Sequence, residues 1–131
     1  SRLPDSMRLL TGLTRLHIPF NNMTTIPSCV ASLKNLLVLN IVKNNLDAVS
    51  DHVGALSRLR ELRLSQNAIT KVDPSVGTLG ELVELQLNHN ELTSLPESVA
   101  QLTSLQRLNV SHNRLTTLPE DLGACSALTA L

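Results

Sequence analysis

Apolar residues recur along this chain with a period of 23 residues. Leucine, isoleucine or valine stands at positions 1, 4 and 6 of each unit, and asparagine stands at position 9. Complete units begin at residues 13, 36, 59, 82 and 105, and the asparagines that close the pattern are Asn21, Asn44, Asn67, Asn90 and Asn113. Because no unit shifts this spacing by even one residue, the chain is a repeat array.

The first part of each unit predicts a short β-strand. Apolar and polar residues alternate around positions 4 to 6, which is typical of a strand buried on one face. The rest of the unit supplies the crossover of about a dozen residues that a parallel neighbour requires. Pro27, Pro96 and Pro119 mark where this crossover turns, and Asp73-Pro74 predicts a helix N-cap followed by proline at the first helical position. We therefore expect parallel strands joined by short helical or 3-10 turns on the convex side.

The asparagine column has a structural interpretation. A buried side-chain amide both donates and accepts hydrogen bonds, so it can satisfy backbone groups at the bend where each strand ends. Its presence in every unit argues against a catalytic role for any one asparagine. Gly54, Gly77 and Gly123 also share one convex column, which indicates close packing.

A fixed repeat of this length and consensus is typical of leucine-rich repeats. We predict an α/β leucine-rich-repeat solenoid, a curved right-handed horseshoe with a parallel sheet on its concave face. Residues 1–131 form a single array of five full repeats with a partial repeat at each end. Leu3-Pro4 aligns with Leu95-Pro96, Leu128 opens a sixth unit, and neither end carries a polar capping repeat. These features predict a segment of a longer chain.

Charge and composition limit the function classes. The chain has 11 basic and 11 acidic residues, and a net charge of zero gives no bulk attraction to nucleic acid. The longest apolar run, Leu36 to Leu39, is far shorter than the roughly 20 residues that span a bilayer, so we expect no membrane insertion.

The two cysteines lie four repeats apart, which at about 5 Å per strand is beyond disulfide reach. Cys125 falls in a buried apolar column, and Cys29 falls in a column that we expect to be exposed. The sequence has no cysteine clusters, which favours a reducing compartment and predicts a cytoplasmic protein.

Side chains that point outward from the strands are the candidate binding residues. Phe20, the one aromatic residue, is either an anchor contributing about 2 kcal/mol or more or a cover for the rim of the preceding turn. Arg63 and Arg107 either orient a partner or form a ladder of cross-strand ion pairs. The predicted partner-binding residues are Arg15, His17, Phe20, Leu37, Val38, Asn40, Val42, Lys43, Glu61, Arg63, Glu84, Gln86, His89, Arg107, Asn109 and His112.

Catalytic, cofactor and metal sites are not predicted. The sequence has no glycine loop that could cradle a phosphate, and no nucleophile stands near a base and an orienting acid. His89 and His112 fall in one column, but two histidines without a third ligand make a poor zinc site. Asn22 and Asn109 match the glycosylation sequon, and we interpret both as chance matches because a glycan on Asn109 would block the sheet.

The consensus Leu-x-x-Leu-x-Leu-x-x-Asn-x-Leu-x-x-Leu-Pro runs from Leu82 to Pro96 and, with Val110 at its third apolar position, from Leu105 to Pro119. In this the chain resembles the 23-residue, intracellular Ras-group leucine-rich-repeat proteins, which include Shoc2-like scaffolds, polarity scaffolds and plant intracellular Ras-group arrays. The resemblance implies a binding scaffold for a small GTPase, a phosphatase or another signalling protein. Ser50 and Asp73 depart from the consensus, because they stand where it has proline.

The predicted function is therefore a non-catalytic protein-interaction module that binds its partner on the concave face of an intracellular signalling scaffold. One alternative is an architectural segment of a large assembly, which would use the convex face and the open ends. A third is the regulatory repeat region of a multidomain enzyme.

Overall fold

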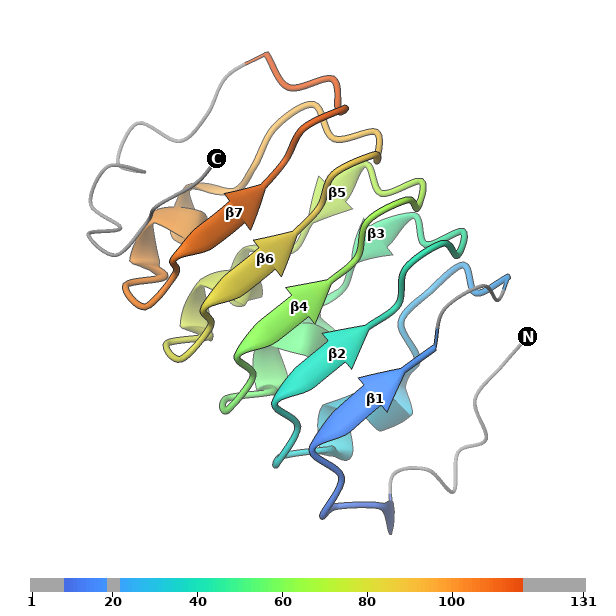
Figure 1. The fold of residues 1–131 in the computed structure, drawn as a ribbon, viewed down its shortest axis with the longest axis vertical. Helices are drawn as coiled ribbons and strands as arrows, with labels where there is room; N and C mark the ends of the chain where they lie inside the picture. Colours follow the sequence, from blue (N-terminus) through green and yellow to red (C-terminus); the bar gives the residue numbers. More distant parts are fainter. Residues whose placement is uncertain (1–8, 19–21, 117–131) are drawn as a thin grey trace.

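Each repeat contributes one strand to a parallel sheet. The computed structural model describes residues 9–18 and 22–116 (Figure 1). The five-stranded sheet has the order β1-β2-β4-β6-β7, and every strand pairs at the same repeat position, as in Leu16↔Leu39↔Leu62↔Leu85↔Leu108. The prediction of parallel strands is confirmed. The strands are β1 (Arg15–His17), β2 (Val38–Asn40), β4 (Glu61–Arg63), β6 (Glu84–Gln86) and β7 (Arg107–Asn109).

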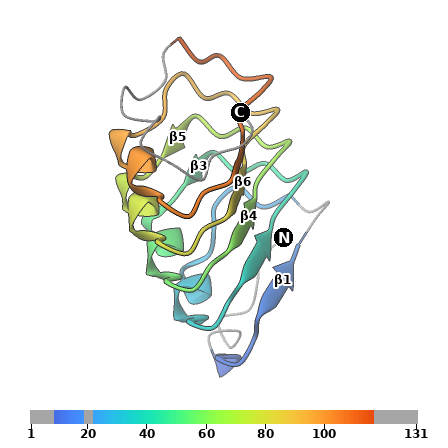
Figure 2. The same ribbon diagram turned by 60° about the vertical axis from the view of Figure 1, so that its left-hand side comes forward.

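Short 3-10 helices stack on the opposite side of the molecule (Figure 2). Each is five residues long, which confirms the prediction of brief turns rather than long helices. Before η4, the side chain of Asp73 accepts a hydrogen bond of 2.9 Å from the backbone N–H of Ser75, and Pro74 begins the helix as predicted. In the described part of the chain these helices are η2 (Ser28–Ser32), η3 (Asp51–Ala55), η4 (Pro74–Thr78) and η5 (Glu97–Gln101).

A second, two-stranded sheet forms where the repeats depart from the Leu-Pro consensus. Strand β3 (Ala48–Val49) pairs in parallel with β5 (Lys71–Val72). The backbone N–H of Asp73 donates to the carbonyl oxygen of Val49 at 2.9 Å. Proline at that position has no N–H to donate. The replacement of the consensus proline by Asp73 therefore permits this additional bond between β3 and β5.

A continuous apolar core fills the space between the sheet and the turns, and Leu39, Leu62 and Leu85 in its middle are 0–1% exposed. The prediction that Cys29 is exposed was wrong, because the residue is 6% exposed and buried. In the same column, Ser75 and Ser98 lie against glycines of the preceding 3-10 helix, so this column is closer to its neighbours than a solvent-facing column would be. A thiol is small and apolar enough to be enclosed at such a position. Cys125 lies outside the described residues.

The asparagine at position 9 links its unit to the one before it. Asn67 Nδ2 donates to the carbonyl oxygen of Ile41 at 2.9 Å, and its Oδ1 accepts from the backbone N–H of Leu46 at 3.1 Å. Both partners belong to the preceding repeat. Equivalent pairs of bonds are made by Asn44, Asn90 and Asn113. We call these four residues the asparagine ladder; Asn21 lies outside the described residues.

Glycine on the turn side allows neighbouring turns to approach each other. A methyl group added at Gly77 would lie 2.6 Å from the backbone oxygen of Ser98, and one added at Gly54 would lie 2.6 Å from Oγ of Ser75. Both distances are too short for atoms that are not bonded. The convex glycine column is therefore required by packing between successive turns; Gly123 lies outside the described residues.

Removing one amide of the asparagine ladder should destabilise the array. We expect Asn67→Ala to lower the free energy of unfolding by about 2–4 kcal/mol, because the Leu46 N–H and the Ile41 carbonyl lose their partner. Urea denaturation followed by circular dichroism measures the change. Asn45→Ala is the matched control, since this exposed neighbour of Asn44 uses its backbone rather than its side chain to bond. Equal stability of the two variants would contradict the structural role of the ladder.

A methyl group at Gly77 should also destabilise the fold. Gly77→Ala should cost about 1–3 kcal/mol, because the backbone of Ser98 must move away. Gly80→Ala is the control, since a methyl group there meets no atom within 4 Å. We expect that control to be neutral or slightly stabilising, because alanine restricts the unfolded chain. The urea denaturation midpoints of the two variants measure this difference. If Gly77→Ala is as stable as Gly80→Ala, the packing argument is wrong.

Candidate partner-binding surface

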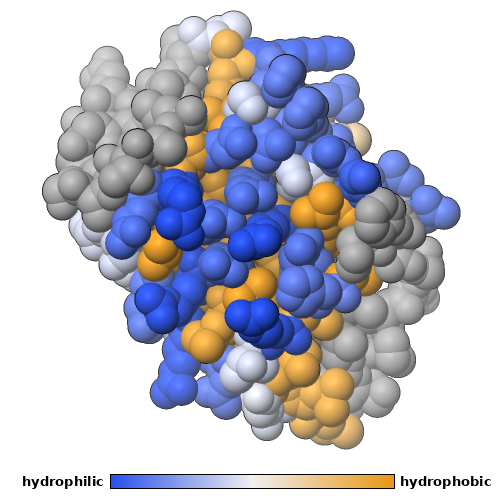
Figure 3. Space-filling view, viewed as in Figure 1, coloured by the Kyte–Doolittle hydropathy of each residue, from blue (hydrophilic) through white to orange (hydrophobic). Residues whose placement is uncertain are grey.

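We call the outer surface of the five-stranded sheet the strand face. It is formed by positions 2, 3, 5, 7 and 8 of the repeats. It corresponds to the predicted concave face and faces the viewer in Figure 3, where hydrophilic and hydrophobic patches alternate. Phe20 lies outside the described residues. Of the other predicted binding residues, Val38 and Glu84 are buried. The half-buried ones are Asn40, Val42, Glu61, Arg63 and Gln86, and the exposed ones are Arg15, His17, Leu37, Lys43, His89, Arg107, Asn109 and His112.

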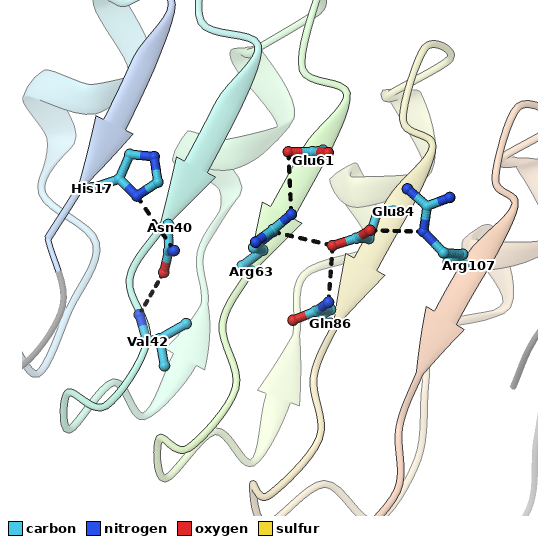
Figure 4. A network of polar contacts seen from close by, with 8 residues as sticks. All are labelled: His17, Asn40, Val42, Glu61, Arg63, Glu84, Gln86 and Arg107. Carbon is cyan, nitrogen blue, oxygen red and sulfur yellow. Dashed lines mark hydrogen bonds and ion pairs between the residues drawn. The ribbon is translucent and has the colours of Figure 1, made fainter.

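Glu84 is the centre of a charged network across β4, β6 and β7 (Figure 4). Its Oε1 accepts from Nε of Arg107 at 2.7 Å, and its Oε2 lies 3.1 Å from Nε of Arg63. Gln86 Nε2 donates to the same Oε2 at 2.8 Å. Arg63 also reaches Glu61, with 3.5 Å between Nη2 and Oε2. Two arginines therefore compensate one nearly buried carboxylate.

This network determines what each of its members can offer to a partner. The Glu84 side chain is only 6% exposed, whereas those of Arg63 and Arg107 are 37% and 51% exposed. Burying a carboxylate without partners would be costly, so the contacts of Glu84 with the two arginines are favoured. These contacts hold both guanidinium groups in place. Glu84 thus acts mainly as an internal anchor, and the arginines present the surface charge.

The asparagines at position 5 also have internal bonds. Asn40 Oδ1 accepts from the backbone N–H of Val42 at 3.2 Å, and its Nδ2 lies 3.4 Å from Nδ1 of His17 (Figure 4). Asn109 repeats the first contact with the N–H of Ser111 at 3.1 Å. These bonds fix the chain as it leaves β2 and β7, so the amides are already oriented before any partner arrives.

The residue at position 8 adopts a left-handed backbone in each unit where the structure describes it. Lys43, Gln66, His89 and His112 have φ between 55° and 58°. Such a conformation costs of order 1 kcal/mol for residues other than glycine. The sequence gives no indication of it, because neither glycine nor asparagine marks the position. These residues lie at the edge of the sheet where the strands end, three positions after the last residue of each strand.

His89 and His112 stack on each other at that edge, with ring centroids 4.1 Å apart and an interplanar angle of 9°. Among residues 9–18 and 22–116, no three or more histidine, cysteine or acidic side chains gather in a way that could hold a metal ion. The pair therefore forms a flat, polar patch of surface.

A hollow of about 330 Å³ lies near the start of the strands. Three arginines, one glutamate and three aliphatic residues line it: Arg15, Leu37, Val38, Arg60, Glu61, Val83 and Arg107. Arg60 and Val83 were missed by the sequence analysis. Both occupy position 2, the same column as the predicted Leu37, and that shared column would have identified them.

No helix in the described part of the chain has the length and apolar character needed to cross a membrane.

Comparison with known proteins supports the fold. No curated protein matches the chain. Among solved structures, a leucine-rich-repeat protein of Leptospira interrogans, LIC12759, is 32% identical, with a TM-score of 0.93 over 96% of this chain and 32% of that one.

Two further structures are similar over 98% of this chain. The crystal structure of PEPR1-AtPEP1 is 29% identical with a TM-score of 0.87, and this chain covers 19% of it. The ectodomain of the Arabidopsis thaliana membrane receptor kinase GASSHO1/SCHENGEN3, in complex with CASPARIAN STRIP INTEGRITY FACTOR 2, is 27% identical with a TM-score of 0.79, and 16% of it is covered. This chain thus spans less than a third of these proteins.

The repeat profile matches most of the sequence. A profile described as leucine rich repeat matches residues 11–69, 57–115 and 80–131. These ranges overlap and together cover the chain from residue 11 to its last residue. With the repeated strands, the 3-10 turns and the asparagine ladder, they show that this chain belongs to the leucine-rich-repeat family.

Proposed function

We propose that this chain is a non-catalytic module that binds a protein partner on its strand face, as part of an intracellular signalling scaffold. The observation that carries the proposal is the fixed network around Glu84, which presents Arg63 and Arg107 at the surface of the sheet. Side chains that are already ordered lose little conformational freedom on binding, so such a surface favours specific recognition.

The family and the similar structures support a protein or peptide partner. Leucine-rich repeats are in general protein-interaction modules. Among the similar structures, the receptor ectodomain is in complex with a named factor. The strand face of this chain combines amides, arginines and aliphatic residues, a mixture that suits protein surfaces.

The class of partner follows from the resemblance to Ras-group arrays. This resemblance favours a small GTPase, a phosphatase or another signalling protein in the cytoplasm. On this proposal the array positions its partner and performs no chemistry. A catalytic domain elsewhere in the parent protein is compatible with it.

Photo-crosslinking from the two sides of the array tests the proposal. A photoreactive amino acid replaces exposed His17 or Asn109 on the strand face, or exposed Asp51 or Glu97 on the turn side. After irradiation in cell extract, mass spectrometry identifies the proteins joined to each position. We expect one protein to be captured from both strand-face positions and from neither turn-side position.

The four positions carry the same reactive group, so the turn-side variants control for non-specific capture. Circular dichroism shows whether each variant is folded. If the same protein is captured only from Asp51 and Glu97, the partner binds the turns, and the architectural alternative replaces the proposal.

A further inference from the structure

The strand face is basic although the whole chain is neutral. Among the described residues at its five column positions, five side chains are basic and two are acidic, which gives a net charge of +3. The complete chain has 11 of each sign, so the remaining residues carry a net charge of −3. The basic residues of the strand face are Arg15, Lys43, Arg60, Arg63 and Arg107, and the acidic ones are Glu61 and Glu84.

The hollow near the start of the strands concentrates this charge around an apolar floor. Backbone hydrogen bonds of 2.8 Å join Arg60 N–H to the Leu37 carbonyl and Val83 N–H to the Arg60 carbonyl, so these residues lie side by side directly before β2, β4 and β6. Val38 and Val83 add aliphatic surface beside Leu37. Arg15 on β1 and Arg107 on β7 line the two ends of the hollow.

Two of the three arginines in the hollow have charges that remain available. Arg107 is held by Glu84, and Glu61 is paired with Arg63. Arg15 and Arg60 are exposed, and within residues 9–18 and 22–116 neither forms an ion pair. Their guanidinium groups are free to bind carboxylates, which they match in shape.

The dimensions of the hollow suit an extended chain. Adjacent strands lie about 4.8 Å apart, so the five strands from β1 to β7 span about 19 Å. An extended peptide rises about 3.3 Å per residue and would cross this distance with about six residues. Its side chains would alternate between the floor of the hollow and the open side.

We infer that this hollow binds an extended, acidic segment of the partner protein, with aspartate or glutamate side chains on Arg15 and Arg60 and an aliphatic side chain over Leu37, Val38 and Val83. The inference rests on the proposed function and specifies the partner chemistry of the same surface. Charge complementarity supports it, because the free charges in the hollow are positive and the neighbouring acidic groups are already paired.

Selection from a random peptide library tests this inference. A library of linear dodecapeptides is selected against the full chain, and the strongest binder is synthesised with a fluorescent label. We expect the selected sequences to be enriched in aspartate and glutamate beside leucine, isoleucine or valine. The Kd, measured by fluorescence anisotropy, should rise as salt is added, because ions screen the contacts with the arginines.

Two charge reversals test whether the peptide binds in the hollow or elsewhere on the molecule. Arg60→Glu should weaken the binding of the selected peptide by about tenfold or more, since it places a negative charge opposite the peptide carboxylates. Arg114→Glu makes the same change at an exposed arginine outside the hollow and should leave the Kd unchanged. Urea denaturation of both variants shows whether they are equally folded.

The outcomes distinguish this inference from the proposed function. Neutral or basic selected peptides, no selected peptide at all, or an unchanged Kd in Arg60→Glu would each overturn the acidic-segment inference. The strand-face function would still stand if His17 and Asn109 crosslink a partner. If Arg60→Glu leaves the peptide Kd unchanged and the partner protein crosslinks only from Asp51 and Glu97 on the turn side, both the inference and the proposed function are wrong.

Discussion

The bond between each asparagine amide and the preceding repeat is the constraint on which the rest of this structure depends. Asn44, Asn67, Asn90 and Asn113 each accept from a backbone N–H 21 residues earlier and donate to a carbonyl 26 residues earlier. Because equivalent bonds recur between successive repeats, they hold the repeats in one register, and this register aligns the columns of side chains.

The aligned columns explain why the strand face can be organised for binding. The register places Arg107 directly opposite Glu84, and it places Arg63 two residues along the neighbouring strand, so one carboxylate meets arginines from both sides. On the turn side the same register brings Gly77 against Ser98, where only a hydrogen atom fits. A single periodic constraint therefore produces a close-packed side and a side with ordered, charged groups.

The sequence predicted the features that recur and missed those that depend on single atoms. The parallel strands and the short turns followed from the period, because every unit repeats the same evidence. The strands occupy positions 3 to 5, within the segment where the sequence predicted them, but alternation around positions 4 to 6 did not locate their ends, since strand ends depend on backbone hydrogen bonds. The β3–β5 pairing needed the N–H of Asp73, and the left-handed backbone at His89 has no marker in the sequence. The net charge of zero did not predict a basic strand face, because a sum over the whole chain does not show where the charged residues lie.

Hydrogen exchange measured residue by residue by NMR is the most direct test of the central claim that the asparagine ladder holds the repeats in register. The amides of Met23, Leu46, Ile69 and Leu92 donate to asparagine side chains rather than to backbone carbonyls. If the ladder is integral to the array, these amides exchange as slowly as the amides within the five-stranded sheet. Rapid exchange at all four, with the sheet amides still protected, would show that the ladder opens independently and would contradict the account.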